Sequence, residues 1–236
     1  MAGPHDALFK SVFAQPEHAV ALIRPHLSDA LQAHVDWSTL QLVPGSFVDE
    51  ELREQHTDLL YSVLLAGQVA RIYVLFEHQS SGDPWMALRL LRYMLRIWEA
   101  CVADGATRLP VIVPVVLHRG ESGWRAATRF EALFDLPPEA APFTPHFGFA
   151  LDDLAVQSDA AVQARAASAF TRLVLSALQQ VRGDRRLAEL LRGWSGLFRE
   201  LAQAANGQRA LHLLITYIFE VRGREELAAI DTTASE

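Results

Sequence analysis

Alternating hydrophobic and polar positions predict a β-hairpin between residues 55 and 81. Two strongly β-prone runs, Asp58–Leu65 and Val69–Phe76, flank the short break Ala66-Gly67-Gln68. Glycine as the first residue of a two-residue loop is typical of a type II′ hairpin turn. With Gly67 and Gln68 as that loop, Asp58 lies directly opposite Glu77. Strand alternation then places both carboxylates on one face of the hairpin, while the other face is apolar core.

This register brings two carboxylates close together. Opposed residues in an antiparallel pair have Cβ atoms about 4.5–5.5 Å apart, so Asp58 and Glu77 repel each other unless a positive charge lies between them. A divalent cation would relieve the repulsion, and oxygen ligands suit Mg²⁺ or Mn²⁺. The repulsion also predicts that Glu77→Gln stabilises the metal-free protein. The alternative interpretation is that both carboxylates, at the rim of a buried sheet, only reach water.

A helix and a strand are predicted after the hairpin. Asp83 and Pro84 form a strong helix start, and the helix should run to about Val102. The run Leu109–Leu117 predicts a strand, and its two prolines favour an edge or bulged position. A helix between strands in this order predicts an α/β fold in which the helix is a crossover. The expected buried stripe of the helix consists of Leu88, Leu91, Leu95 and Trp98.

Shorter elements are predicted on both sides of this central part. Periodic apolar positions predict helices over residues 5–14 and from Pro16 onward. Short strands are expected over residues 37–43 and 147–151.

The composition changes from about Asp152 onward. Ala, Leu, Arg and Gln predominate there, and three segments carry helical periodicity: residues 160–181, 185–205 and 207–222. We therefore expect one domain over residues 1–155 and a helical extension over residues 156–230 that packs on it.

Composition narrows the class of protein. The net charge of −7 argues against a uniformly basic nucleic-acid binder, although an acidic metal-dependent nuclease remains compatible with it. The longest apolar runs fall short of the ~20 residues that a membrane span requires, and the first residues lack the pattern of a signal peptide. The single cysteine, Cys101, is expected to be a core thiol. These features predict a cytoplasmic protein with no membrane partner, and they leave homo-oligomerisation open.

Five motifs follow one another along the chain: His5–Lys10, Ser46–Arg53, Asp58–Tyr61, Tyr73–Ser81 and Leu88–Met94. In order and spacing they resemble the Rpn family of recombination-promoting nucleases and transposase-like proteins. The pattern of Asp58 followed by Glu77-x-Gln79 is also similar to the signature of PD-(D/E)XK nucleases, with Gln in the place of the usual Lys. The resemblance covers about residues 5–155.

The resemblance implies a fold and an activity. The implied fold is α/β, with a restriction-endonuclease-like core of a mixed sheet flanked by helices and a C-terminal helical extension. The implied activity is metal-dependent endonucleolytic hydrolysis of DNA in recombination or mobile-element biology. In this mechanism Asp58, Glu77 and the backbone carbonyl of His78 hold Mg²⁺ or Mn²⁺. Gln79 orients the attacking water by hydrogen bonding, without the charge that Lys would bring.

Four further residues are candidates for this site. Asp6 either completes the metal shell or caps the start of its helix. Arg89, Arg92 and Arg96 lie at helical spacing and either contact DNA phosphates or form an ordinary solvated face.

Two other functions compete with the nuclease. One is a non-catalytic DNA-binding or assembly module that retains the nuclease fold, and the other is a metal-dependent hydrolase of a small substrate. Cleavage of DNA, and its loss in Asp58→Ala, distinguishes the nuclease from the binding module.

Overall fold

The computed structural model describes residues 3–43, 57–77, 82–135, 137–181, 183 and 185–223. The chain forms two compact units. One comprises Phe13–Val156, and the other comprises Met1–Val12 together with Gln157–Glu236. Most of the first helix therefore belongs with the C-terminal helices.

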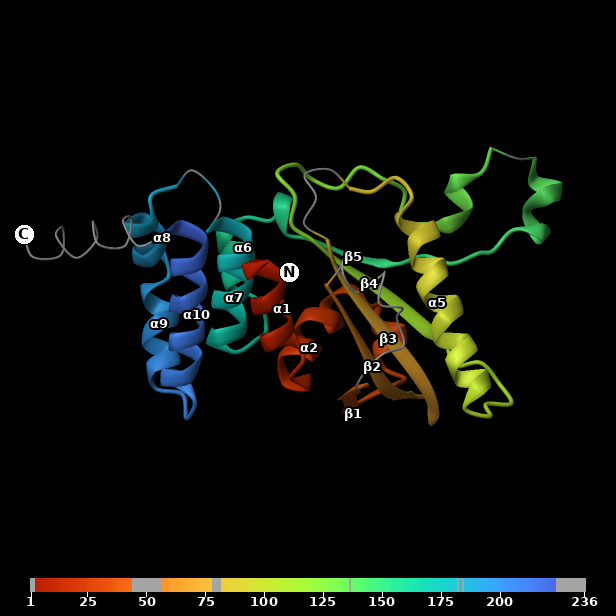
Figure 1. Cartoon of the computed structure of the whole chain (residues 1–236), viewed down its shortest axis with the longest axis horizontal. Helices are drawn as coiled ribbons and strands as arrows, with labels where there is room; N and C mark the ends of the chain where they lie inside the picture. The colour runs from red at the N-terminus through yellow and green to blue at the C-terminus, as the bar shows by residue number, and fades with distance from the viewer. Residues whose placement is uncertain are drawn as a thin grey trace, which may run out of the picture. The chain divides into compact units, whose positions relative to one another are not determined.

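The unit Phe13–Val156 is built around a mixed sheet (Figure 1). Within the described residues its strand order is β1-β2-β3-β4-β5. Strands β1 to β3 pair antiparallel, whereas β3, β4 and β5 run parallel. Helix α5 (Met86–Ala103) connects β3 to the parallel β4, which confirms the predicted α/β crossover. The strands are β1 (Val35–Leu42), β2 (Thr57–Leu65), β3 (Gln68–Glu77), β4 (Ile112–His118) and β5 (Ala150–Asp153).

The hairpin of β2 and β3 exists, but its predicted register is wrong. Leu65 pairs with Gln68, so the loop is Ala66-Gly67 and Asp58 lies opposite Leu75 instead of Glu77. Both loop residues have positive φ, 48° and 77°, which is the requirement of a type I′ turn. The shift moves each partner by two residues, so Asp58 and Glu77 stay on the same face of the sheet. They are diagonal neighbours, whose Cα atoms are typically about 7–8 Å apart.

Helix α5 covers the face of the sheet that carries Asp58 and Glu77 (Figure 1). The predicted stripe is wrong in part, because Leu95 is 52% exposed while Leu88, Leu91 and Trp98 are only partly buried. A second set of residues on α5 also has helical spacing, beginning at the first helical residue, Met86. This second set, and not the predicted one, packs against Tyr73, Leu75 and Val116 of the strands. Its buried residues are Met86, Ala87, Leu90, Tyr93, Met94 and Ile97.

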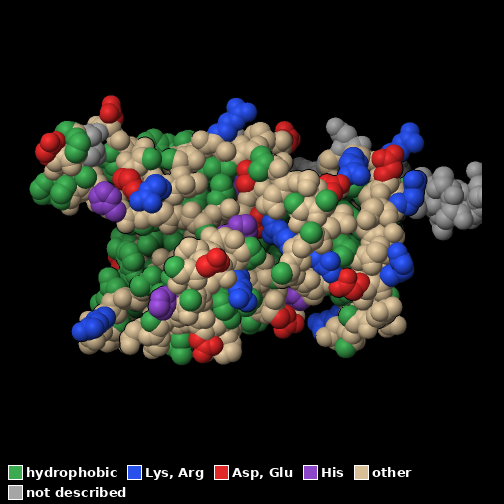
Figure 2. All heavy atoms as spheres, turned by 180° about the vertical axis from the view of Figure 1, so that it is seen from behind, with side chains coloured by type: hydrophobic (Ala, Val, Ile, Leu, Met, Phe, Trp, Pro, Cys, Tyr) green, Lys and Arg blue, Asp and Glu red, His purple; other side chains and the backbone are tan. Residues whose placement is uncertain are grey.

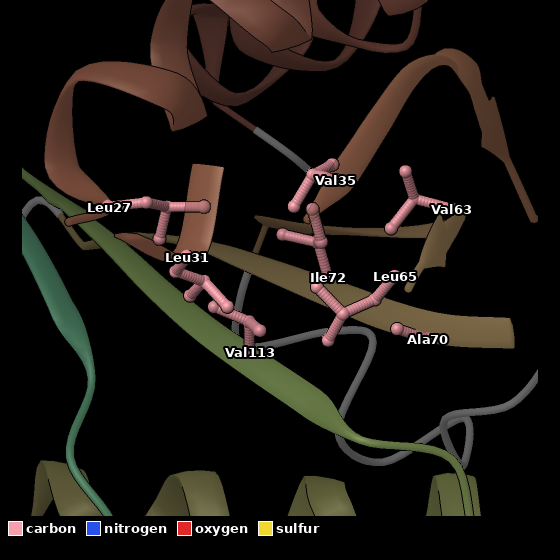
Figure 3. Close-up of a pocket in the computed structure, with 8 residues that line it drawn as sticks. All are labelled: Leu27, Leu31, Val35, Val63, Leu65, Ala70, Ile72 and Val113. Carbon is pink, nitrogen blue, oxygen red and sulfur yellow. The ribbon is translucent and has the colours of Figure 1, made fainter. Parts of the chain in front are cut away.

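The opposite face is covered by the segment that precedes β1. It contains α2 (Pro16–Ile23), the 3-10 helix η1 (Arg24–His26) and α3 (Asp29–Gln32). The Tyr61 hydroxyl, on this face, donates to the carbonyl of Phe13. A small pocket lies here between Leu27 and Leu31 on one side and Ile72 and Val113 on the other (Figure 3). Only aliphatic side chains line it, so it offers no group for binding a phosphate or a metal ion.

Strand β4 is an interior strand, which corrects the expected edge position. It lies between β3 and β5. Its pairing with β5 begins at Val115, one residue after Pro114, so the missing N–H of the proline does not interrupt that pairing. The connection from β4 to β5 contains the 3-10 helices η2 (Phe130–Leu133) and η3 (Pro138–Phe143), and η4 (Leu154–Val156) follows β5.

The second unit is helical. The long predicted segments 160–181 and 185–205 each divide into two shorter helices, whereas the helix over 207–222 is confirmed. Within it, His5 Nδ1 and the Tyr217 hydroxyl oxygen are 2.6 Å apart. None of the described helices is both long and apolar enough to cross a membrane. The helices are α1 (Pro4–Phe13), α6 (Asp159–Gln163), α7 (Ala169–Gln180), α8 (Leu187–Gly193), α9 (Ser195–Ala202) and α10 (Gly207–Arg222).

Candidate functional site

Four polar side chains lie on one face of the sheet, near the ends of neighbouring strands. Glu77 ends β3 and pairs with His118, which ends β4, and His118 pairs with Asp153, which ends β5. Asp58, near the start of the antiparallel β2, pairs with Leu75. Paired residues share a face, so strand alternation puts all four side chains on the side that α5 covers. Polar groups at the carboxyl ends of parallel strands are placed as in the binding crevices of α/β sheets.

Glu77 is a buried carboxylate with a cationic partner. The residue is only 1% exposed to solvent. The Arg89 guanidinium of α5 forms an ion pair with its Oε2 atom, and Arg89 Nη1 also lies 3.3 Å from Asp83 Oδ2. A buried carboxylate is costly unless it is paired. Arg89 therefore supplies the positive charge that the sequence argument assigned to a cation.

Asp58 is half-buried and is fixed by a tyrosine on the neighbouring strand. The Tyr73 hydroxyl donates a hydrogen bond of 2.8 Å to Asp58 Oδ2. Tyr73 stacks on Tyr93 of α5, with ring centroids 5.1 Å apart. Burial raises the pKa of the Tyr73 hydroxyl well above its usual value, and the neighbouring Asp58 carboxylate raises it further. The phenol thus stays a hydrogen-bond donor across the physiological pH range.

His118 and Asp153 form a second pair in this row. The His118 side chain is fully buried, and its Nδ1 lies 2.9 Å from Asp153 Oδ1. Asp153 also accepts backbone N–H groups from Trp124 (2.6 Å, at Oδ2) and Ala155 (3.1 Å, at Oδ1). The Trp124 ring meets the His118 ring edge to face, at 5.2 Å. Asp153 therefore holds both the imidazole and the segment after β4.

Neither His118 nor Asp153 is among the residues predicted from the sequence. A usable signal exists for His118, because it directly follows the apolar residues Val115-Val116-Leu117 and is the last residue of β4. Asp153 is the last residue of β5 but follows another acid, Asp152. What the pattern of single strands does not reveal is that β4 and β5 lie beside β3 in parallel.

The structure places the predicted site residues in different surroundings. Arg89 turns toward Glu77 and its side chain is 14% exposed, whereas Arg92 is exposed and Arg96 is partly exposed. Asp6 is the third residue of α1, and its Oδ2 accepts the N–H of Gly3 at 3.0 Å, as in one half of a capping box. It belongs to the helical unit. His78 and Gln79 lie outside the described residues.

The donor set for a metal ion is partly present. Two carboxylates on one face, Asp58 and Glu77, are the oxygen ligands that Mg²⁺ and Mn²⁺ prefer. Among the residues that the structure describes, no group of three or more His, Cys, Asp and Glu side chains is arranged to hold a metal ion. A third ligand at the backbone carbonyl of His78 would lie outside these residues.

A mixed sheet with acidic and basic groups at the ends of adjacent strands defines an α/β protein with a strand-end polar site. The chain belongs to the family described as putative transposase, YhgA-like, whose model matches residues 3–209. No solved structure matches it.

Over about half of its length the chain is similar to curated proteins that are named recombination-promoting nucleases or an inactive protein like them. The chain is 37% identical to recombination-promoting nuclease RpnC of Escherichia coli (strain K12) over 119 residues, which is 50% of this chain and 40% of that protein. It is 40% identical to recombination-promoting nuclease RpnD of Escherichia coli O157:H7 over 118 residues, 50% of this chain and 45% of that protein. It is 36% identical to the inactive recombination-promoting nuclease-like protein RpnE of Escherichia coli (strain K12) over 121 residues, 51% of this chain and 40% of that protein. The chain thus spans less than half the length of these relatives.

Proposed function

We propose that this protein is a divalent-metal-dependent DNA endonuclease with a restriction-endonuclease-like core, which acts in recombination or mobile-element biology. The observation that carries the proposal is the placement of Asp58 and Glu77 on one face of adjacent strands. These carboxylates stand in the order that PD-(D/E)XK nucleases use. Relatives named recombination-promoting nucleases support the same activity.

Asp58, Glu77 and the backbone carbonyl of His78 would hold Mg²⁺ or Mn²⁺. Such a cation would activate water as the nucleophile and offset the charge that develops on the phosphate. The chain's own residues prepare the site: Tyr73 fixes one oxygen of Asp58 by its hydrogen bond, and Arg89 forms an ion pair with the buried Glu77 carboxylate. Gln79 would orient the water by hydrogen bonding.

The arginines of α5 then divide into two roles. Arg89 competes with a cation for the Glu77 carboxylate, because both bring positive charge to the same group. Arg92 and Arg96 are the candidates for DNA phosphate contacts, with Arg92 the more exposed of the two. On the face drawn in Figure 2 the described Lys and Arg side chains are scattered among Asp and Glu, which favours local phosphate contacts over a continuous basic surface on that face.

The deciding experiment compares DNA cleavage by wild type and Asp58→Ala. Wild type should nick or linearise supercoiled DNA with Mg²⁺ or Mn²⁺ and not with EDTA, and Asp58→Ala should abolish this while its circular dichroism stays native. Glu99→Gln, which removes an exposed acid from α5, is the matched control and should keep full activity. Equal cleavage by Asp58→Ala would show that another site, or a contaminant, does the chemistry.

A second candidate function is a DNA-binding or assembly module without catalysis. Two observations favour it: Arg89 satisfies the charge of Glu77 without a metal, and RpnE is named an inactive member. This function predicts DNA binding that is unchanged by EDTA and no cleavage by wild type under any metal condition.

A further inference from the structure

The most exposed of the five tryptophans lies directly before helix α5. Trp85 is 59% exposed, whereas Trp37, Trp98 and Trp124 are partly buried and Trp194 is buried. Tryptophan is highly buried on average, because its large ring contributes strongly to cores and interfaces. A single exposed apolar residue is nevertheless ordinary on a protein surface. The position and the neighbours of Trp85 therefore decide whether it marks a site.

Trp85 is connected to the candidate site through Asp83. The Trp85 backbone N–H donates a hydrogen bond of 2.8 Å to Asp83 Oδ1, and Asp83 Oδ2 lies 3.3 Å from Arg89 Nη1. Arg89 in turn forms the ion pair with Glu77. The backbone that carries the exposed indole is thus linked, through two side chains, to a carboxylate of the proposed metal site.

The backbone at Trp85 is held on both sides. Before it, Gly82 approaches the Trp124 ring so closely that an added Cβ atom would lie 2.7 Å away. After it, the Arg89 backbone N–H donates to the Trp85 carbonyl at 2.9 Å, which includes that carbonyl in the first turn of the helix. A large aromatic ring on an ordered backbone loses little conformational entropy when a ligand stacks on it.

Arg92 lies on the same side of α5 as Trp85. Residues seven apart are two helical turns apart, so the two side chains share a face at a separation of about 10.5 Å along the axis. Both residues are exposed. An aromatic ring beside a guanidinium is a combination by which proteins bind single-stranded nucleic acid, because bases stack on the ring and phosphates pair with the cation. The charge of Arg92 therefore favours a nucleic acid over an apolar partner for this face.

We propose that Trp85 stacks on an unpaired base of the DNA substrate while Arg92 contacts a phosphate of the same strand. This inference rests on the proposed nuclease function and names its substrate class, which is DNA with unpaired nucleotides beside the scissile phosphate. In a continuous duplex the bases are stacked on one another. One of them must first be unstacked, at a cost in free energy, before it can reach Trp85.

The test measures binding in EDTA with two labelled probes, oligothymidylate and a fully abasic oligonucleotide of the same length. The abasic strand keeps the phosphates and lacks the bases, so the ratio of the two dissociation constants isolates stacking. Wild type should bind oligothymidylate about 5- to 150-fold more tightly than the abasic strand, the range expected for one base–aromatic stack. Trp85→Ala should abolish this preference by weakening the binding of oligothymidylate alone, and Trp85→Phe should keep most of it.

Two further variants separate stacking from other effects. Val102→Ala is the matched control, because it removes a 57% exposed apolar side chain near the other end of α5. It should leave both dissociation constants unchanged. Arg92→Gln should weaken the binding of both strands and lower the salt slope by about one unit. Trp85→Ala should leave the salt slope unchanged, because the stacked ring releases no counterion from a phosphate.

Each outcome bears on the proposal. Equal binding of the two strands by wild type overturns it without any variant. A folded Trp85→Ala that keeps the wild-type preference also overturns it, and the exposed indole would then be assigned to a protein contact. Cleavage of DNA by wild type alongside either result would leave the proposed nuclease intact. Absence of binding to either strand and to duplex DNA would overturn the proposed function together with this inference.

Tryptophan fluorescence decides if Trp85→Ala fails to fold. Wild-type fluorescence should fall when oligothymidylate binds, because the base stacks on the exposed indole. Trp85→Phe should bind oligothymidylate and lose this decrease. A decrease that persists in Trp85→Phe would show that the base stacks elsewhere.

Discussion

Arg89, in the first turn of α5, forms a buried ion pair with Glu77, the last residue of β3. Helix α5, which follows β3 in the chain, thus places the Arg89 guanidinium beside the end of β3. Breaking a buried pair by removing one partner leaves an uncompensated charge, which costs about 3–5 kcal/mol. The pair therefore links the electrostatics of the candidate site to the stability of the fold.

The first prediction is a double-mutant cycle on this pair. In EDTA, Arg89→Gln should lower the free energy of unfolding by about 3–5 kcal/mol, because it removes the ion-pair partner of the buried Glu77 carboxylate. Glu77→Gln should also destabilise, but by less, because Arg89 keeps Asp83 as a partner. The double variant should lose less than the sum of the two, with a coupling of about 0.5–3 kcal/mol. Urea denaturation measures all three, with Arg92→Gln as the exposed control, expected within about 0.5 kcal/mol of wild type.

This prediction reverses the sign expected from the sequence. Repulsion between Asp58 and Glu77 alone would make Glu77→Gln stabilising in the metal-free protein. The ion pair with Arg89 is what changes the sign. A stabilised Glu77→Gln would show that Arg89 does not compensate this carboxylate in solution.

The second prediction concerns alkaline pH. Burial raises the pKa of Tyr61 and Tyr73 well above the usual value, and it raises the pKa of Tyr93 to about 12. A raised folded-state pKa stabilises the protein fully below the unfolded pKa near 10, and this stabilisation is lost as pH rises through the folded value. Stability should therefore fall above about pH 10.

Absorbance of tyrosinate near 295 nm checks this directly. Three of the four tyrosines should stay protonated at pH 11 as long as the near-ultraviolet circular dichroism is native. Tyr93→Phe should remove the titration step near 12 and no other. Full ionisation of the native protein by pH 11 would contradict the burial of these hydroxyls.

The extent of sequence-based prediction differs between local and long-range features. The hairpin, the α/β crossover and the side of the sheet that carries Asp58 and Glu77 follow from periodicity and connection order. The register does not, because it depends on Ala66 taking a left-handed φ of 48°, which non-glycine residues rarely do.

The remaining part of the site depends on pairings distant in the sequence. His118 and Asp153 are brought together by the parallel pairing of β4 and β5, which no local pattern encodes. Arg89 and Arg92 share one helix and one residue type, and only the position of the helix on the sheet decides that Arg89 faces Glu77. The family motifs locate the carboxylates Asp58 and Glu77. They do not identify the groups that contact them, the Tyr73 hydroxyl at Asp58 and the Arg89 guanidinium at Glu77.

The third prediction concerns the packing behind the site. A Cβ atom added at Gly82 would lie 2.7 Å from the Trp124 ring, which in turn contacts His118. Gly82→Ala should therefore lower the free energy of unfolding by about 1–3 kcal/mol through overpacking. Gly196→Ala is the matched control, because nothing lies within 4 Å of its added Cβ and it is in helix α9. That change should stabilise by about 0.5–1 kcal/mol. Equal effects of the two substitutions would refute the close approach of Gly82 to Trp124.

The last prediction separates two routes by which DNA could approach. Arg92 is exposed on α5, in the same unit as Asp58 and Glu77, while Arg186 is exposed in the helical unit. Each phosphate contact that is lost should reduce the salt slope of DNA binding by about one unit and weaken all sequences alike. If DNA passes over α5, Arg92→Gln should lower both the affinity at low salt and the slope, whereas Arg186→Gln should leave both unchanged.

Fluorescence anisotropy with a labelled duplex at several salt concentrations measures both quantities. Both substitutions remove one exposed positive charge, so the change in net charge is the same and only position differs. An unchanged slope for Arg92→Gln with a reduced slope for Arg186→Gln would place the DNA on the helical unit. The arginine stripe of α5 would then be an ordinary solvated face, apart from Arg89, whose ion pair with Glu77 already accounts for its charge.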